Sequence, residues 1–303
     1  METKIIGFTE IALAVDLLKK GELVAFPTET VYGLGAIAFS EEAVAKVFAT
    51  KKRPADNPLI VHIAAFDELT ILCKEVPPHV LALCQYFWPG PLTIVLEKSS
   101  SVPHIVSAGH QTVAIRMPQH PIALSLIEKV GAPLVAPSAN LSGRPSPTSA
   151  KDVYEDLNGE IGLILDGGPC EIGIESTVVS FIGEKPLLLR PGKITKKEIE
   201  EVLGEELFLP PPHAPIHSPG MKYRHYAPKA NIKLCKERGE IQGPFVLSLR
   251  PRPGERLLSS QTLYALFREA DRLQVKEIEI DCSDELMRDA GMYNRVLRAT
   301  ESH

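Results

Sequence analysis

Hydrophobic positions along the first two-thirds of the chain follow two alternating patterns. In one, apolar residues recur at helical spacing between Glu10 and Lys20, which predicts a helix that Thr9 caps and Gly21 ends. A second helix is expected to start at Ser40, because two glutamates follow it where acidic side chains favour the helix dipole. Two further helices are predicted at 121–130 and 150–157.

The other pattern consists of short apolar runs, β-branched or leucine-rich, that are bounded by glycine, proline or aspartate. Such runs are typical of strands. They lie at 23–26, 59–63, 92–96, 113–117, 134–136, 162–165, 177–181 and 187–189. Strands interleaved with helices predict an α/β fold with a mixed sheet.

The chain after Pro228 repeats the two patterns on a smaller scale. Strands are predicted at 232–234, 245–249 and 278–280, and a helix at 261–273. A unit of about 70 residues has a marginal core, so we expect it to lean on the rest of the protein. We therefore predict a large domain at 1–207, of a size that can hold a catalytic site, and a small α/β domain at 231–303. A proline-rich linker at 208–230 would join them.

Composition narrows the class of protein. Hydrophobic residues make up 44% of the 303 residues and charged residues 23%, which is ordinary for a soluble globular protein. The net charge of −5 argues against a protein whose main function is to bind nucleic acid. Five cysteines without a CxxC pair fit a reducing compartment, and neither a signal peptide nor a membrane span is indicated. We expect a cytoplasmic protein.

Polar residues cluster where predicted strands end. Thr30 lies in the segment Pro27–Gly35, whose glycines permit close backbone approach, although a plain turn between two strands has the same pattern. Ser138 and Asn140 follow another strand end, where sheets present donors to ligands, and a simple Asx or Ser turn stays open as the alternative. Ser146 continues that stretch.

Several basic side chains are candidates for binding anions. Lys51 and Arg53 end a predicted helix, where cations also complement the helix dipole, and Pro54 would fix them as a fork for phosphate oxygens. Arg116 lies within an apolar strand and needs a partner there, either a ligand carboxylate or an internal acidic residue. His62, in another apolar strand, has the pattern of a core histidine.

The common motifs of nucleotide hydrolysis, hydride transfer, zinc proteolysis and acyl transfer are absent from the sequence: it has no Walker A, GxGxxG, HExxH or GxSxG. It offers cations, hydroxyls and amides, which suit a polyanionic nucleotide and electrostatic stabilisation. The predicted linker ends in the donor-rich string SPGMKYRHYAP, which fits either a binding loop or a basic tether.

Taken in order, these motifs resemble the YrdC-type domain of the threonylcarbamoyl-AMP synthases. The segments that carry the resemblance, roughly over residues 5–207, are PTETVYGLG, KKRP, VAIRMP, PSANLSG, GIESTVV and RPG. The linker string extends the likeness to the two-domain form of that family. The C-terminal unit fits less well, because the turn before Asn294 and Arg295 keeps one glycine where the family has a glycine-rich turn.

The resemblance implies a YrdC-like twisted mixed sheet with helices, plus a smaller Rossmann-like α/β C-terminal domain. It also implies an L-threonylcarbamoyladenylate synthase, a nucleotidyltransferase that joins L-threonine, bicarbonate or CO2, and ATP and releases pyrophosphate. Mg2+ is expected with the ATP, and no residue is assigned as a metal ligand. The product would pass to a downstream machinery that modifies tRNA to threonylcarbamoyladenosine next to the anticodon.

By motif position, the resemblance also assigns residues to the two substrates. Threonine would be held by Thr30, His62, Arg116 and Ser176. ATP would be held by Lys51, Arg53, Asn57, Thr112, Ser138, Asn140, Ser146 and Arg190, with Lys51 and Arg53 as the catalytic pair and with His225 and Tyr226 of the linker closing over the nucleotide.

Two other functions are compatible with a YrdC-type fold. An RNA-binding or ribosome-associated protein would use the basic run at 222–238, but no aromatic stacking platform or known RNA module accompanies that run. A weak contact with tRNA stays open. A carbamoyltransferase of the hydrogenase-maturation type would carry acylphosphatase and zinc-finger segments, and these 303 residues contain neither.

Overall fold

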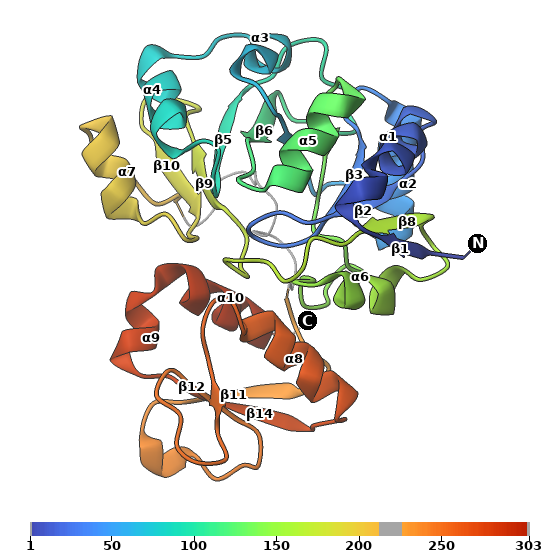
Figure 1. Cartoon of the computed structure of the whole chain (residues 1–303). Coiled ribbons are helices and arrows are strands. Elements are labelled where there is room, and N and C mark those ends of the chain that lie inside the picture. The colour runs from blue at the N-terminus through green and yellow to red at the C-terminus, as the bar shows by residue number, and fades with distance from the viewer. Residues whose placement is uncertain (1, 212–225, 302–303) are drawn as a thin grey trace.

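The structure consists of two α/β units, drawn one above the other in Figure 1. It is a computed structural model that describes residues 2–211 and 226–301. Within these residues the first unit is built on a mixed sheet of ten strands and the second on a sheet of four. The predicted α/β class with a mixed sheet is confirmed. Most of the predicted linker falls at 212–225, outside the described residues.

The ten strands of the first sheet lie in the order β1-β8-β2-β3-β7-β4-β6-β5-β9-β10. Their bounds are β1 (Lys4–Ile6), β2 (Val24–Phe26), β3 (Gly33–Ile37), β4 (Ile60–His62), β5 (Leu92–Glu97), β6 (Thr112–Arg116), β7 (Leu134–Val135), β8 (Leu163–Leu165), β9 (Thr177–Ser180) and β10 (Leu187–Arg190). Neighbours are parallel in β1/β8, β2/β8, β4/β6 and β5/β9. The other neighbouring pairs are antiparallel. Strands far apart in sequence therefore end beside one another.

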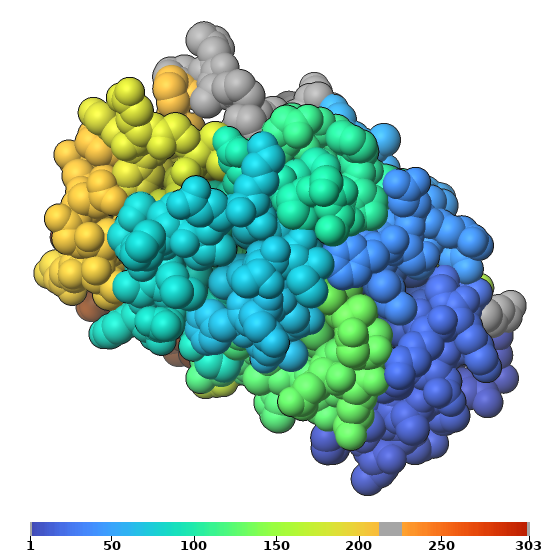
Figure 2. Space-filling model, turned by 90° about the horizontal axis from the view of Figure 1, so that it is seen from above, coloured from blue at the N-terminus to red at the C-terminus, as the bar shows by residue number. Residues whose placement is uncertain are grey.

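Helices cover both faces of this sheet, which is why most of its strands are buried apolar runs. Val24 and Phe26 of β2 pack under α1 (Ile11–Lys19) and α5 (Pro121–Val130), whereas Ala25 between them belongs to the core on the opposite face. That second face carries α2 (Glu41–Lys51), α3 (Leu69–Leu72), α4 (Pro78–Phe87), α6 (Ala150–Leu157) and α7 (Lys196–Leu203). Seen from above, the first unit hides nearly all of the second (Figure 2).

Local signals predicted several of these elements correctly. The helices predicted at 121–130 and 150–157 have those bounds, and Ser40 caps α2 by accepting a hydrogen bond from the backbone N–H of Ala43. The prediction that Thr9 caps the first helix is wrong. A short 3-10 helix, Phe8–Glu10, leads directly into α1, and no side chain makes a cap hydrogen bond there.

The second unit has a fully parallel sheet in the order β11-β14-β12-β13. The strands are β11 (Asn231–Cys235), β12 (Val246–Ser248), β13 (Arg256–Leu257) and β14 (Glu277–Asp281), and the helices are α8 (Leu263–Arg272), α9 (Asp284–Arg288) and α10 (Ala290–Thr300). In Figure 1, α8 and α10 lie between this sheet and the first unit. Among the described residues, no helix combines the length and the apolar character needed to span a membrane.

The small unit leans on the large one, as its marginal core predicts. Val31 and Ile174 of the first unit belong to the same buried cluster as Phe267 and Val296 of the second. Arg268 of α8 is almost wholly buried and donates to both carboxylate oxygens of Asp156, at 3.1 and 3.0 Å. Such a paired, bidentate arginine fixes one surface against the other.

Candidate active site

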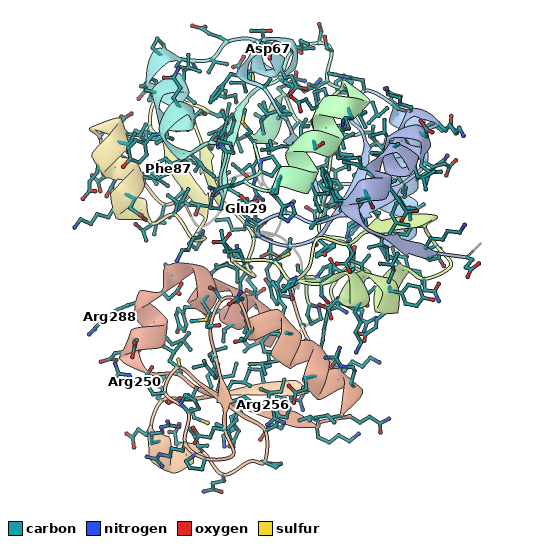
Figure 3. The ribbon with its side chains drawn as sticks, viewed as in Figure 1. Glu29, Asp67, Phe87, Arg250, Arg256 and Arg288 are labelled. Atoms are coloured by element: carbon teal, nitrogen blue, oxygen red, sulfur yellow. The ribbon has the colours of Figure 1, made fainter. Side chains whose placement is uncertain are left out.

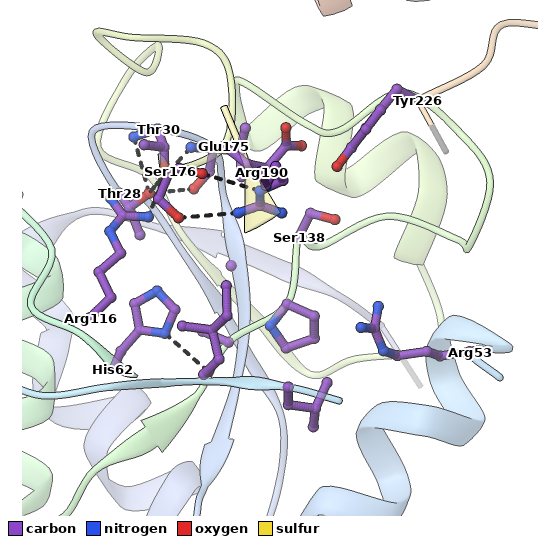
Figure 4. Close-up of a pocket in the computed structure, with 16 residues that line it drawn as sticks. Thr28, Thr30, Arg53, His62, Arg116, Ser138, Glu175, Ser176, Arg190 and Tyr226 are labelled. Carbon is purple, nitrogen blue, oxygen red and sulfur yellow. Dashed lines mark hydrogen bonds between the residues drawn. The ribbon is translucent and has the colours of Figure 1, made fainter. Parts of the chain in front are cut away.

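A cleft opens in the first unit where the ends of several strands meet (Figure 4). Its walls come from the segments after β2 and β7, from β4 and the end of β6, from the segment before β9, and from the end of β10. Of the residues predicted for the site, the cleft is lined by Thr30, Arg53, His62, Arg116, Ser138, Ser176, Arg190 and Tyr226. The convergence of these side chains makes the cleft the candidate active site.

Arg116 stands at the end of β6 with its charge compensated by a buried acid. Its Nη2 lies 2.5 Å from Oε1 of Glu29, and its Nη1 donates to Oγ1 of Thr30 at 2.8 Å. Arg116 and Glu29 are 4% and 2% exposed. The internal acidic partner that the sequence allowed for Arg116 is Glu29.

His62 lies directly beside Arg116 in the sheet. The two residues are register partners in the parallel pair β4/β6, and Nδ1 of His62 lies 3.3 Å from the carbonyl oxygen of Ile60. Burial, and then the nearby Arg116, lower the pKa of His62 to about 3. The imidazole is therefore neutral at physiological pH and faces the cleft as a hydrogen-bonding group without charge.

Arg53 lines the opposite side of the cleft from Arg116 in Figure 4. Its Nη2 donates to Oδ1 of Asn57 at 2.7 Å and to the carbonyl of Pro58 at 2.8 Å, and its Nε donates to the carbonyl of Asn57 at 3.0 Å. These bonds fix the direction of the guanidinium. Asn57 therefore acts by orienting Arg53. Asn57 itself is not among the lining residues.

Lys51 is buried beneath the cleft, 1% exposed, and is not among its lining residues. Its Nζ donates to the backbone carbonyls of Ser138 and Asn140, the latter at 2.6 Å. Burial, reinforced by the charge of Arg53, holds the pKa of Lys51 well below its usual range. In this arrangement Lys51 holds the loop that presents Ser138, and a direct contact with phosphate stays a prediction.

Ser176 and Arg190, which both line the cleft, are hydrogen-bonded to each other. Nε of Arg190 donates to the carbonyl of Ser176 and Nη2 to its Oγ, both at 3.1 Å. The same Oγ lies 2.8 Å from Oγ1 of Thr93 on β5. The serine predicted for threonine and the arginine predicted for ATP are therefore held in a single unit.

Glu175 is a cleft residue that the sequence did not single out. Its Oε1 accepts a hydrogen bond from Oγ of Ser146 at 2.6 Å, and its Oε2 accepts one from the hydroxyl of Tyr264 at 2.9 Å and one from Nε of Arg295 at 2.7 Å. Burial works to raise the pKa of Glu175, but the nearby arginines Arg295 and Arg190 bring it below its usual value. The carboxylate is thus ionised and fully bonded.

The remaining predicted residues have varied places. Tyr226 lines the cleft and stacks on Tyr264 with 5.6 Å between ring centroids, in a backbone conformation with φ of 67° that a bulky residue adopts only under constraint. Asn140 donates from Nδ2 to two nearby carbonyls, and Thr112 begins β6 at the end away from Arg116. Neither is among the lining residues, and His225 falls outside the described ones.

The described residues contain no group of three or more histidine, cysteine, aspartate or glutamate side chains placed to hold a metal ion. Glu175 is the one carboxylate among the lining residues, and both of its oxygens already accept hydrogen bonds. Mg2+ commonly keeps several waters and binds through substrate phosphates. Among the lining residues of the cleft, the only carboxylate has no oxygen without a hydrogen bond.

Fold and cleft together define a two-unit α/β protein with an arginine-lined ligand site. The family model described as "Telomere recombination" (Sua5/YciO/YrdC) matches residues 16–192, and the model described as "Threonylcarbamoyl-AMP synthase, C-terminal domain" matches residues 194–300. The chain belongs to the Sua5/YciO/YrdC family, in its form with a Sua5-type C-terminal domain.

Known proteins similar to the chain include two enzymes named threonylcarbamoyl-AMP synthase. The one from Pyrococcus abyssi is 53% identical over 239 residues, which cover 78% of this chain and 68% of the relative. The one from Bacillus subtilis is 53% identical over 232 residues, covering 75% and 67%. The crystal structure of P. abyssi Sua5 complexed with L-threonine superimposes with a TM-score of 0.91 at 40% identity, over 99% of this chain and 98% of that one.

Proposed function

We propose that the protein is an L-threonylcarbamoyladenylate synthase, a nucleotidyltransferase that converts L-threonine, bicarbonate or CO2, and ATP into threonylcarbamoyl-AMP and pyrophosphate. Support comes from relatives that carry this name and from a similar protein whose structure contains L-threonine. The alternative of an RNA-binding protein with the same fold gains no support from these relatives. The reaction would take place in the cytoplasm and supply the machinery that modifies tRNA next to the anticodon.

The observation that carries the proposal is the division of the cleft into two ends. Arg116, Thr30 and neutral His62 stand at one end, and Arg53 stands at the other (Figure 4). The first end offers a guanidinium and a hydroxyl to the carboxylate and side chain of an amino acid. The second offers an aimed guanidinium to phosphate oxygens. A site of this form brings an amino acid and a nucleotide together without a covalent enzyme intermediate.

The chemistry needs positioning more than reactive side chains. The threonine nitrogen forms a bond to the carbon of CO2 and loses a proton, which gives a carbamate. A carbamate oxygen then bonds to the α-phosphorus of ATP as the bond to the β-phosphate oxygen breaks, and pyrophosphate leaves. Negative charge develops on phosphate oxygens, where Arg53 and Arg190 would stabilise it. Because His62 is uncharged, it would orient threonine without competing for its carboxylate.

Mg2+, when bound, would neutralise phosphate charge and favour the departure of pyrophosphate. In the proposed site it would be held by the nucleotide's phosphates and by water, since the cleft's own carboxylate already accepts three hydrogen bonds. A weak contact with tRNA remains part of the proposal.

A pyrophosphate-release assay tests the function. The purified protein should release pyrophosphate from ATP only when both L-threonine and bicarbonate are present. L-Serine, which lacks the threonine methyl group, and D-threonine are the matched substrates for specificity. Equal release without threonine would sink the proposal and leave a generic ATP hydrolase.

A further inference from the structure

Helix α10 of the C-terminal unit reaches the wall of the cleft. Near the start of this helix, Gly291 lies against the backbone of Gly192, which follows β10. A Cβ atom added at Gly291 would lie 2.7 Å from the carbonyl oxygen of Gly192, closer than real side chains approach. The helix therefore contacts the first unit backbone to backbone, directly behind the segment that carries Arg190.

From this helix Arg295 donates to two separate segments of the cleft wall. Its Nε bonds to Oε2 of Glu175 at 2.7 Å, its Nη2 to the backbone carbonyl of Glu175 at 3.0 Å, and its Nη1 to the carbonyl of Pro191 at 2.8 Å. Arg295 is fully buried. One guanidinium thus ties together the residues just before Ser176 and just after Arg190.

Tyr264 of α8 adds a second bond from the C-terminal unit to the same carboxylate. Its hydroxyl donates to Oε2 of Glu175 at 2.9 Å, and its ring stacks on Tyr226, whose ring also lies 5.4 Å from the guanidinium of Arg295. Of the three hydrogen bonds that the carboxylate of Glu175 accepts, two come from the second unit. The fixed state of this cleft residue depends on residues outside the first unit.

Charge explains why this dependence matters. Glu175 lines a cleft proposed to hold the polyphosphate of ATP, next to Arg190. Without a partner, a buried carboxylate in that wall would repel phosphate and attract the guanidinium of Arg190 away from it. Arg295 cancels the charge, and its bonds to the two backbone segments keep Ser176 and Arg190 in register.

We propose that Arg295 and Tyr264 are positioning residues of the active site, through which the C-terminal unit neutralises Glu175 and completes the nucleotide-binding wall. The proposal rests on the proposed function for the identity of the nucleotide. Arg295 and Tyr264 touch no substrate and act through Glu175, Ser176 and Arg190. The sequence motif around Asn294 and Arg295 thereby gains a role that its single glycine had left unassigned.

The test compares Arg295→Met with Arg298→Met in the full-length protein. Arg298 lies one turn further along α10 and pairs with Glu301 at the surface, so its loss controls for a missing arginine in the same helix. Affinity for a non-hydrolysable ATP analogue and for L-threonine is measured by calorimetry, and the folded state by near-UV circular dichroism. Arg295→Met should weaken nucleotide binding on the order of tenfold to a hundredfold, by analogy with the loss that follows removal of a residue that orients a metal ligand.

Threonine affinity should fall less than nucleotide affinity, because Arg116 and Thr30 at the other end of the cleft are unchanged. The free energy of unfolding should also fall, because the buried carboxylate of Glu175 loses its arginine. A second substitution separates charge from structure. In the Arg295→Met background, Glu175→Gln removes the uncompensated charge and should restore most of the nucleotide affinity. An arginine with only a structural role predicts no such rescue.

Tyr264→Phe is a third variant, which keeps the stacking on Tyr226 and removes one hydrogen bond. It should give a smaller loss of nucleotide affinity, and it keeps the proposal testable if Arg295→Met fails to fold.

Nucleotide affinity in Arg295→Met equal to that in Arg298→Met would overturn the proposal, as would an undiminished loss in the double variant. The binding measurements need no turnover. A wild-type protein that binds the ATP analogue but makes no threonylcarbamoyl-AMP would contradict the proposed function while leaving this inference standing.

Discussion

The guanidinium of Arg116 and the carboxylate of Glu29 form a buried ion pair with 2.5 Å between Nη2 and Oε1. Figure 3 shows Glu29 in the interior of the first unit. The pair leaves Arg116 aimed by Glu29 on one side and by Thr30 on the other. A ligand carboxylate would therefore meet a guanidinium whose position is already fixed, which lowers the ordering cost of binding.

Breaking this pair should be costly for stability. Arg116→Met leaves Glu29 charged and unpaired in the interior, so we expect a loss of about 3–5 kcal/mol in the free energy of unfolding, measured by urea denaturation. The double variant with Glu29→Gln should recover a large part of that loss, because no buried charge remains. Equal stabilities of the single and double variants would contradict the account of the pair.

The two ends of the cleft should respond separately to mutation. Arg53→Ala should weaken binding of an ATP analogue, and Arg116→Ala should weaken binding of L-threonine, each by about 2–5 kcal/mol in calorimetry if the lost contact is desolvated. Lys52→Ala, at an exposed position next to Arg53, is the control and should change neither affinity. Losses exchanged between the two variants would invert the substrate map.

The lowered pKa of His62 should be visible in the pH dependence of stability. Between about pH 6.5 and about pH 3 the unfolded state binds a proton that the folded state does not, so the contribution of His62 to stability falls as the pH is lowered. The slope from this residue approaches about 1.4 kcal/mol per pH unit. His62→Gln should show a shallower fall over that window in denaturation series; an unchanged slope would mean that His62 is not buried neutral.

Gly291 should tolerate no side chain. In Gly291→Ala the new Cβ meets backbone atoms of Gly192, which cannot move as a flexible side chain would. We expect a loss of about 1–3 kcal/mol in stability, the usual cost of overpacking. Gly239→Ala, with open space around the new Cβ in the same unit, is the control. Scanning calorimetry decides: a Gly291→Ala variant as stable as the control would show that α10 is free to shift.

Local sequence signals predict elements better than they predict partners. Ser40 begins α2 as predicted, and α5 ends at Val130 as predicted, where Gly131 adopts the left-handed conformation of a helix C-cap. By contrast, β1 (Lys4–Ile6) has two exposed residues of three and no apolar run, so only its pairing with β8 makes it a strand. Helix α4 was not predicted, because the prolines at its start are typical of a loop, although Pro78 fits the first turn of a helix.

The same limit applies to the site. Of the residues that were predicted from their motif positions and that the structure describes, eight line one cleft. The sequence did not indicate Glu29 and Glu175, because each has its role through an arginine far along the chain. Glu29 pairs with Arg116, and Glu175 pairs with Arg295, 120 residues away. No pattern of spacing in the sequence announces such pairs, since the fold alone brings them together.

Identification of the product tests the proposed synthase activity without reliance on any variant. The purified protein is incubated with ATP, Mg2+, L-threonine and isotope-labelled bicarbonate, and the nucleotides are resolved by mass spectrometry. The account predicts threonylcarbamoyl-AMP that carries the label in its carbamoyl carbon, formed together with pyrophosphate and absent when threonine is omitted. Formation of AMP or ADP alone, with no labelled adenylate, would contradict it.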